Sequence, residues 1–87
     1  MRTIFKYPLD VADEQVVALP HGAQILCAQM QHSMPCIWAE VDRQAPVSQR
    51  IFYMYGTGHR VPTDRVQTYV GTVQLSGGAL VFHVYVN

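Results

Sequence analysis

The chain has 87 residues, of which 49% are hydrophobic and 14% are charged, and its six basic side chains balance six acidic ones. A chain of this length forms a single domain with a thin core, so we expect one β domain over residues 1–87. The zero net charge disfavours duplex nucleic acid as a partner. The lack of a long apolar run or a leader-like start disfavours membrane insertion and export, so we expect a cytoplasmic protein.

Short apolar segments between turn residues predict seven strands and at most one helical turn. The expected strands cover residues 3–7, 14–19, 25–32, 36–41, 50–55, 67–75 and 79–86. No long stretch keeps the apolar period of a helix, and turns recur roughly every ten residues. This pattern is typical of an all-β fold with antiparallel strands, and both a compact sandwich and a partly open barrel fit it.

The third and fourth expected strands form a hairpin with Ser33 and Met34 at its tip. This register places Cys27 and Cys36 about four residues apart along the paired strands, which is too far for a disulfide. With no export signal in the sequence, we expect two reduced, partly buried thiols.

The C-terminal stretch 66–87 contains no Asp, Glu, Lys or Arg, and Gly77-Gly78 predicts a hairpin within it. Strands with so little charge usually lie in the middle of a sheet or against another copy of the chain, because exposed uncharged edges recruit other strands. We therefore expect a buried structural centre and a homo-oligomer that covers the surplus apolar surface. The residues expected at that interface are Trp38, Phe82, His83 and Tyr85.

The sharpest local motif is Gly56-Thr57-Gly58-His59-Arg60, which follows two tyrosines on one strand face. Two glycines free the backbone to turn its amides toward one point, which would form an anion-binding nest. The alternative is that the glycines only allow the chain to reverse. Because arginines outnumber acidic residues over 43–65, we expect a small anionic ligand here. The candidate ligand-binding residues are Tyr53, Tyr55, Gly56, Thr57, Gly58, His59, Arg60 and Arg65.

The four histidines and two cysteines have no spacing typical of a metal site. No local motif combines a nucleophile with a base or pairs two carboxylates. We therefore expect neither an enzyme nor a metal or cofactor site.

Six segments of the sequence resemble, in this order, a family of small uncharacterised phage and prophage proteins. They are RTIFKYPL at residues 2–9, HGAQIL at 21–26, QH at 31–32, PCIWA at 35–39, YGTGH at 55–59 and GGALVFHV at 77–84. The family has no established activity, so the resemblance assigns no role to any residue. It implies a phage gene product that acts in the cytoplasm of a bacterial cell.

Three functions fit these features. The first is a phage-encoded homo-oligomeric binding protein that captures an anionic small molecule, such as an immune-signalling nucleotide of the host, as a counter-defence. The second is an inhibitor or adaptor that docks on a bacterial or phage protein, with Trp38, Tyr53 and Tyr55 as anchors. The third is a minor virion component.

Overall fold

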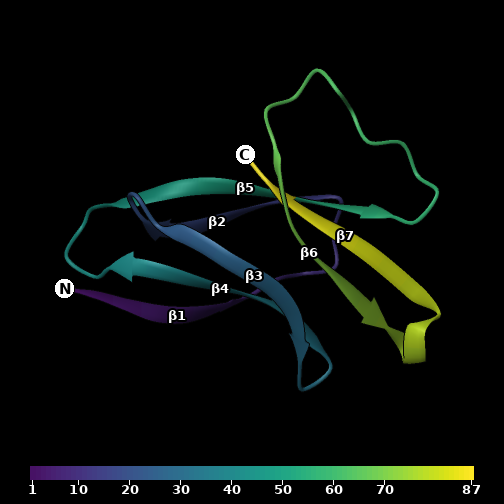
Figure 1. Cartoon of the computed structure of the whole chain (residues 1–87), viewed down its shortest axis with the longest axis horizontal. Coiled ribbons are helices and arrows are strands. Elements are labelled where there is room, and N and C mark those ends of the chain that lie inside the picture. Colours follow the sequence, from purple (N-terminus) through teal and green to yellow (C-terminus); the bar gives the residue numbers. More distant parts are fainter.

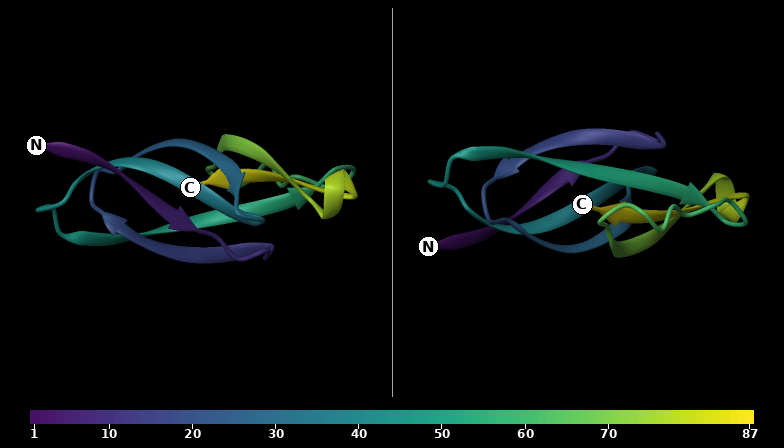
Figure 2. Two further views of the ribbon diagram at one scale, coloured as in Figure 1. Left: turned by 90° about the horizontal axis from the view of Figure 1, so that it is seen from below. Right: turned by 90° about the horizontal axis from the view of Figure 1, so that it is seen from above.

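The computed structural model describes all residues 1–87, which form two antiparallel sheets packed face to face (Figures 1 and 2). A three-stranded sheet has the order β1-β4-β3, and a four-stranded sheet has the order β2-β5-β7-β6. The strands are β1 (Arg2–Pro8), β2 (Glu14–Pro20), β3 (Gln24–Gln31), β4 (Met34–Asp42), β5 (Val47–Gly56), β6 (Thr68–Leu75) and β7 (Leu80–Val86). The predicted all-β fold with seven strands and one helical turn, η1 (Ser76–Gly78), is confirmed, and of the two architectures the sandwich is the correct one.

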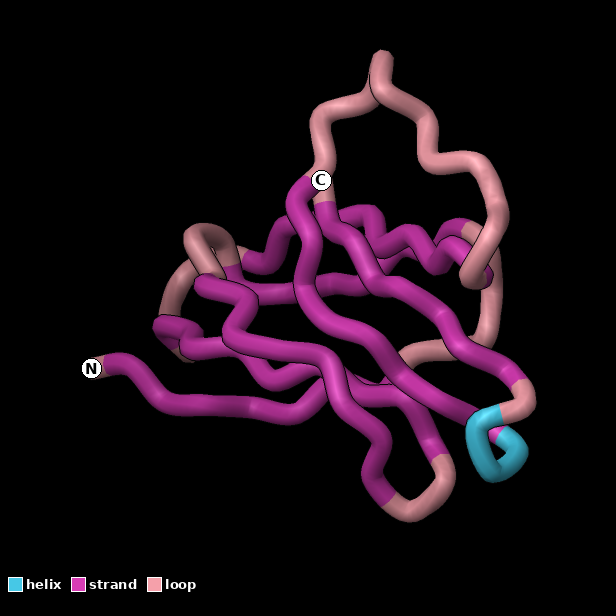
Figure 3. Tube along the Cα trace, turned by 45° about the vertical axis from the view of Figure 1, so that its right-hand side comes forward, coloured by secondary structure: helices cyan, strands magenta, loops and turns pink.

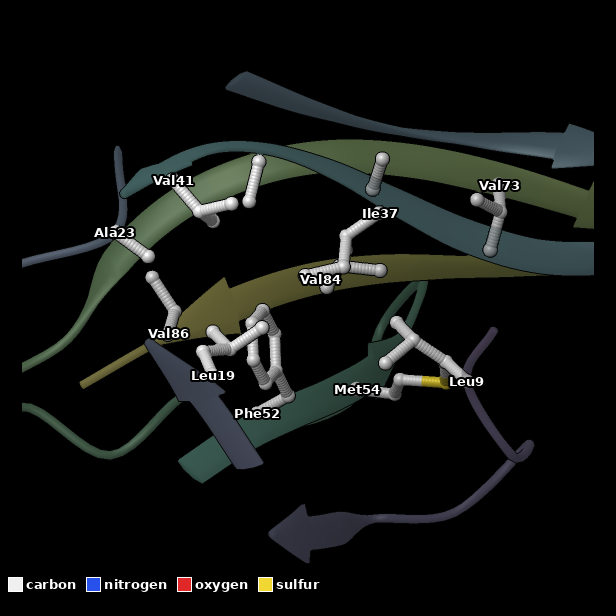
Figure 4. Packing of buried hydrophobic residues seen from close by; sticks show 12 residues of the cluster. Leu9, Leu19, Ala23, Ile37, Val41, Phe52, Met54, Val73, Val84 and Val86 are labelled. Atoms are coloured by element: carbon white, nitrogen blue, oxygen red, sulfur yellow. The ribbon is translucent and has the colours of Figure 1, made fainter. Parts of the chain in front are cut away.

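The core lies between the two sheets, in a molecule whose shortest extent is only 16 Å. Ile37 and Val41 of β4 pack against the layer that holds Phe52 of β5 and Val84 of β7 (Figure 4). All four are fully buried. Because side chains alternate along a strand, the residues between these core positions point away from the core. The outward positions of β5 and β7 include Tyr53, Tyr55 and Tyr85, which belong to the aromatic row described below.

The hairpin between β3 and β4 turns one residue earlier than the sequence predicted. Gln31 pairs with Met34, so His32 and Ser33 form the tip. Both tip residues have positive φ, 50° and 65°, as in the two-residue turns that match the twist of antiparallel strands. Such turns usually carry Gly or Asn, and neither residue is present here to mark the position.

The earlier turn also moves the two cysteines closer together than predicted. Cys36 pairs with Gln29 and Cys27 pairs with Trp38, so the offset between the thiols is two residues rather than four. Both residues lie on the outer face of the three-stranded sheet, where Cys36 is buried and Cys27 is half-buried. Both thiols are free, as expected.

The uncharged C-terminal stretch occupies two different positions. β7 lies at the centre of the four-stranded sheet, between β5 and β6, as predicted for a buried strand. β6 is instead an edge strand, with Thr68, Tyr69 and Thr72 exposed, so the prediction of one buried centre is wrong for β6. The edge of β6 approaches β3 of the other sheet, and a Cβ atom on Gly71 would lie 2.8 Å from the carbonyl oxygen of Ala28.

β5 and β6 run parallel to each other because both are antiparallel to β7, which lies between them. The chain must therefore travel back along the sheet between the end of β5 and the start of β6. Residues 57–67 make this return as a long loop that projects from the body of the molecule (Figures 1 and 3). We call residues 57–67 the return loop.

Candidate functional site

Four tyrosines form an aromatic row across the outer face of the four-stranded sheet. Tyr53 and Tyr55 of β5 stack with their rings 6.4 Å apart, and Tyr85 of β7 contacts the edge of Tyr55 at 5.4 Å. Tyr69 of β6 extends the row, 5.6 Å from Tyr85. The row therefore spans three strands, and the predicted shared face of Tyr53 and Tyr55 is confirmed.

The end of the return loop folds against this aromatic row. The guanidinium of Arg65 lies 4.2 Å from the ring centre of Tyr53, and Arg65 Nη1 donates to the Tyr55 hydroxyl at 3.0 Å. Tyr55 in turn donates to Gln67 Oε1 at 2.7 Å, and Gln67 Nε2 donates to the Pro62 carbonyl at 3.1 Å. Tyr53 is therefore only 7% exposed although it faces away from the core. The hydrogen bond to Tyr55 raises the pKa of the Arg65 guanidinium, which stays charged.

The glycine motif at the start of the return loop is a tight turn. The amide of His59 donates to the Gly56 carbonyl at 3.0 Å, and Gly58 takes a φ of +87°, which favours glycine. The amide of Thr57 donates to the Val81 carbonyl at 3.3 Å. The motif therefore reverses the chain, and two of its amides are committed to backbone carbonyls, so the predicted nest cannot use all the amides of the motif.

An open pocket of about 330 Å³ lies beside this turn. It forms where β2 begins at Glu14 while β5 continues to Gly56, which leaves the end of β5 without a strand neighbour on that side. The return loop forms the opposite wall. The lining residues are Asp13, Glu14, Met54, Tyr55, His59, Arg60, Pro62 and Arg65.

The structure thus brings together only part of the predicted ligand-binding set. Four of its members line this pocket, namely Tyr55, His59, Arg60 and Arg65. Tyr53 lies beneath Arg65. Gly56 and Thr57 line a smaller neighbouring pocket of about 230 Å³, which His59 also borders. Two larger hollows elsewhere, of about 510 and 500 Å³, contain no aromatic side chain and no residue of the glycine motif. A third, of about 410 Å³, lies on the return loop and shares Arg60 and Pro62 with the pocket.

The arginines that the sequence grouped together separate in the fold. Arg43 lies over the ring of Phe5 at 5.9 Å, and Arg50 donates from Nη2 to the Asn87 carbonyl at 2.8 Å. Arg60 and Arg65 alone reach the pocket. Arg60 is exposed and makes no hydrogen bond or ion pair with the rest of the chain, so its guanidinium is free to bind.

The four predicted interface residues do not form one surface. Trp38 lies on the outer face of the three-stranded sheet, between Lys6 and Cys27. His83 and Tyr85 lie on the outer face of the other sheet. Phe82 points inward and packs against the core, because it alternates with His83 along β7. The other three residues belong to two separate faces, so these four residues do not lie on one continuous surface of a single chain, and their role at an interface stays a prediction.

Sequence reasoning missed a chain of hydrogen bonds that holds the glycine turn to the sheet. His83 bonds through Nε2 to Thr57 Oγ1 at 2.8 Å and through Nδ1 to Thr72 Oγ1 at 3.0 Å. Thr72 Oγ1 continues to the Tyr69 hydroxyl at 2.6 Å. The alternation of side chains along β7 indicates that His83 faces outward. Its two threonine partners could not be predicted without knowing which strands and loops lie beside β7.

Nothing in the local sequence predicts that Asp13 and Glu14 line the pocket. They reach the pocket because the Met54 amide donates to the Asp13 carbonyl at 3.1 Å and Glu14 pairs with Tyr53. No three His, Cys, Asp or Glu side chains gather closely enough to bind a metal ion.

Comparisons with known proteins give one match. The model of a family described as a domain of unknown function, DUF7352, matches residues 1–87. No curated protein and no solved structure shows significant similarity to the chain. None of the helical structure in the molecule is long enough and apolar enough to span a membrane.

Proposed function

The chain belongs to the DUF7352 family, and from that starting point we propose that it is a small binding protein that captures an anionic small molecule in the pocket beside the glycine turn. The observation that carries the proposal is the convergence of Arg60, Arg65 and His59 with Tyr55 around one open pocket. The sequence showed only that these residues are close along the chain, whereas the structure shows that they line the same pocket.

Two features of the arginines support anion binding. Arg65 is already held by Tyr53 and Tyr55, so little further ordering is needed when an anion arrives. Arg60 has all its donors free, and a guanidinium presents a planar fork that matches the oxygens of a phosphate or carboxylate. His59 and the half-buried Tyr55, which also line the pocket, provide further donor and aromatic surface.

We place this function in the cytoplasm of a bacterial host, as that of a phage gene product. The support is the sequence resemblance of residues 2–9, 55–59 and 77–84, among others, to phage and prophage proteins. In that setting, nucleotides that the host uses as immune signals are suitable anions, and their capture would be a counter-defence.

The proposal is tested by incubating the purified protein with bacterial lysate, recovering it and measuring its mass by native mass spectrometry. The expected result is a retained small anion that is absent from an Arg60→Ala variant recovered in the same way. A folded wild-type protein that retains no small molecule, and that also gives no heat with nucleotides or phosphate in calorimetry, would overturn the proposal.

A second function, docking on a protein, is favoured by a different face. Around Trp38 on the outer face of the three-stranded sheet, Ile4 is 55% exposed and Leu26, in a bulge of β3, is 43% exposed. Exposed apolar groups around a tryptophan are typical of protein contacts. We propose that this face binds a second copy of the chain, which would give the homo-oligomer expected from composition. A host or phage protein is the alternative partner.

A further inference from the structure

We propose that the pocket selects a dipolar ligand, a guanine mononucleotide, whose phosphate binds Arg60 and His59 and whose base presents its donor edge to Asp13 and Glu14. The inference rests on the proposed function, which requires only that an anion binds. It adds the chemical class of the ligand and the residues that would recognise it.

The pocket has walls of opposite charge that form no ion pair with each other. Asp13 and Glu14 come from the start of β2, whereas Arg60 and Arg65 come from the return loop. The only ion pair in the structure, Arg2 with Glu40, lies elsewhere. Both carboxylates and the Arg60 guanidinium therefore remain available to a ligand.

A simple anion does not suit such a pocket well. Phosphate or a small carboxylate would be attracted by Arg60 but would also lie close to two like-charged carboxylates. A ligand that carries an anion at one end and hydrogen-bond donors at the other satisfies both walls. The carboxylates then accept hydrogen bonds instead of repelling the ligand.

Guanine is the nucleobase whose donors best match a carboxylate. Its N1–H and its N2 amino group point the same way, and a carboxylate has two oxygens that accept such a pair. Adenine offers its N6 amino group beside a ring acceptor, so it gives a carboxylate only one favourable contact. Arg65 provides a surface on which the base can stack, because one face of its guanidinium lies on Tyr53 and its side chain is otherwise exposed.

The size of the pocket restricts the ligand further. Its volume of about 330 Å³ is near the lower end of ligand pockets, which cover roughly 300–1,000 Å³. A space of this size accommodates one nucleotide unit. A dinucleotide would extend beyond the lining residues into solvent.

The test is isothermal titration calorimetry with GMP, AMP and inorganic phosphate as the probes. For the wild-type chain we expect GMP to bind about tenfold or more tightly than AMP, and phosphate to bind more weakly than GMP. In an Asp13→Asn/Glu14→Gln variant the preference for GMP over AMP should disappear while both nucleotides still bind. Asp64→Asn changes an exposed carboxylate of the return loop that does not line the pocket, and it should leave the preference unchanged.

The outcomes separate the two proposals. Equal affinity for GMP and AMP, phosphate binding as tightly as GMP, or an undiminished preference in the folded double variant would each overturn the guanine assignment while anion capture stands. If none of the three probes binds and lysate yields no anion, the proposed function fails, and the guanine assignment fails with it.

Discussion

Gly71 lies directly against the backbone of Ala28, and this contact brings the edge strand of one sheet up to the edge strand of the other. A Cβ atom at residue 71 would be 2.8 Å from the Ala28 carbonyl oxygen and 3.1 Å from its amide nitrogen. Both neighbours are backbone atoms, so neither can move aside as a flexible side chain would. The approach of β6 to β3 therefore depends on the absence of a side chain at this one position.

The first prediction is that Gly71→Ala destabilises the fold. The added methyl group must push the two strands apart, and overpacking of this kind costs about 1–3 kcal/mol. Urea unfolding followed by circular dichroism measures the loss. Thr68→Ala, at an exposed position of the same strand, is the matched control and should have a much smaller effect. Equal stability of Gly71→Ala and the wild type would show that the close contact is not maintained in solution.

The second prediction concerns Arg60. Arg60→Ala should weaken anion binding by about tenfold to a hundredfold, because it removes a charge-assisted donor. Stability should change little, since Arg60 is exposed and makes no hydrogen bond or ion pair with the rest of the chain. Calorimetry with GMP measures the affinity, and thermal unfolding measures the stability. Arg43→Ala removes an arginine far from the pocket and should retain full affinity. The same affinity in both variants would exclude Arg60 as a ligand contact.

The third prediction is that Arg65→Lys loosens the return loop even though it keeps the charge. A lysine cannot reproduce both the planar contact with Tyr53 and the hydrogen bond to the Tyr55 hydroxyl. Amide hydrogen exchange should therefore become faster over residues 57–67 and stay unchanged in β3 and β4. Unaltered protection of the loop would mean that the contacts of Gln67 and Thr57 hold it in place without Arg65.

The fourth prediction is a loss of stability at alkaline pH that depends on Tyr7. Burial against the core raises the pKa of the Tyr7 hydroxyl above its ordinary value of 10.0. The folded chain therefore holds this proton more tightly than the unfolded chain. This proton contributes fully to the free energy of unfolding at pH values below the pKa that Tyr7 has in the unfolded chain. The contribution is lost as the pH rises through the pKa that Tyr7 has in the folded chain. Urea unfolding at pH 8 and at pH 11 should show a smaller decline for Tyr7→Phe than for the wild type, and identical declines would contradict the argument.

The fifth prediction concerns the face around Trp38. Light scattering should give the wild-type chain a mass of at least two subunits, and a Trp38→Ala/Ile4→Ser variant should shift toward the single subunit while keeping its circular dichroism spectrum. Val47→Ser changes an exposed apolar residue of β5, in the other sheet, and should keep the wild-type mass. A wild-type protein that is monomeric at high concentration would remove this face as a self-association surface.

The strands could be predicted well from the sequence because turn residues next to each strand mark where it ends. Pro20-His21-Gly22 ends β2, and Gly56 ends β5, so turn residues alone place these boundaries. The tip of the β3–β4 hairpin was misplaced because His32 and Ser33 adopt positive φ without a glycine or asparagine to indicate it. Alternation along β7 places His83 and Tyr85 on one face and turns Phe82 inward, so these three residues were grouped together without regard to the period of the strand.

The site was harder to predict because it depends on which strands become neighbours. Asp13 and Glu14 reach the pocket only through the pairing of β2 with β5, and no pattern in the sequence encodes that pairing. Arg43 and Arg50 are close to Arg60 along the chain, yet Arg43 lies in the turn before β5 and Arg50 lies near the start of β5, whereas Arg60 follows its end. The length of this extended strand separates them in space. Charge density along a sequence therefore does not identify which arginines will line one pocket.

The order of strands in the larger sheet also constrains how this protein is made. β7 is synthesised after the other six strands, yet it lies between β5 and β6, which the return loop already connects. A nascent chain on the ribosome cannot complete this sheet until residues 80–86 have emerged. Until then, the edge of β5 that later receives β7 remains open, and the inward side of Phe52 lacks the cover of Val84 and Val86.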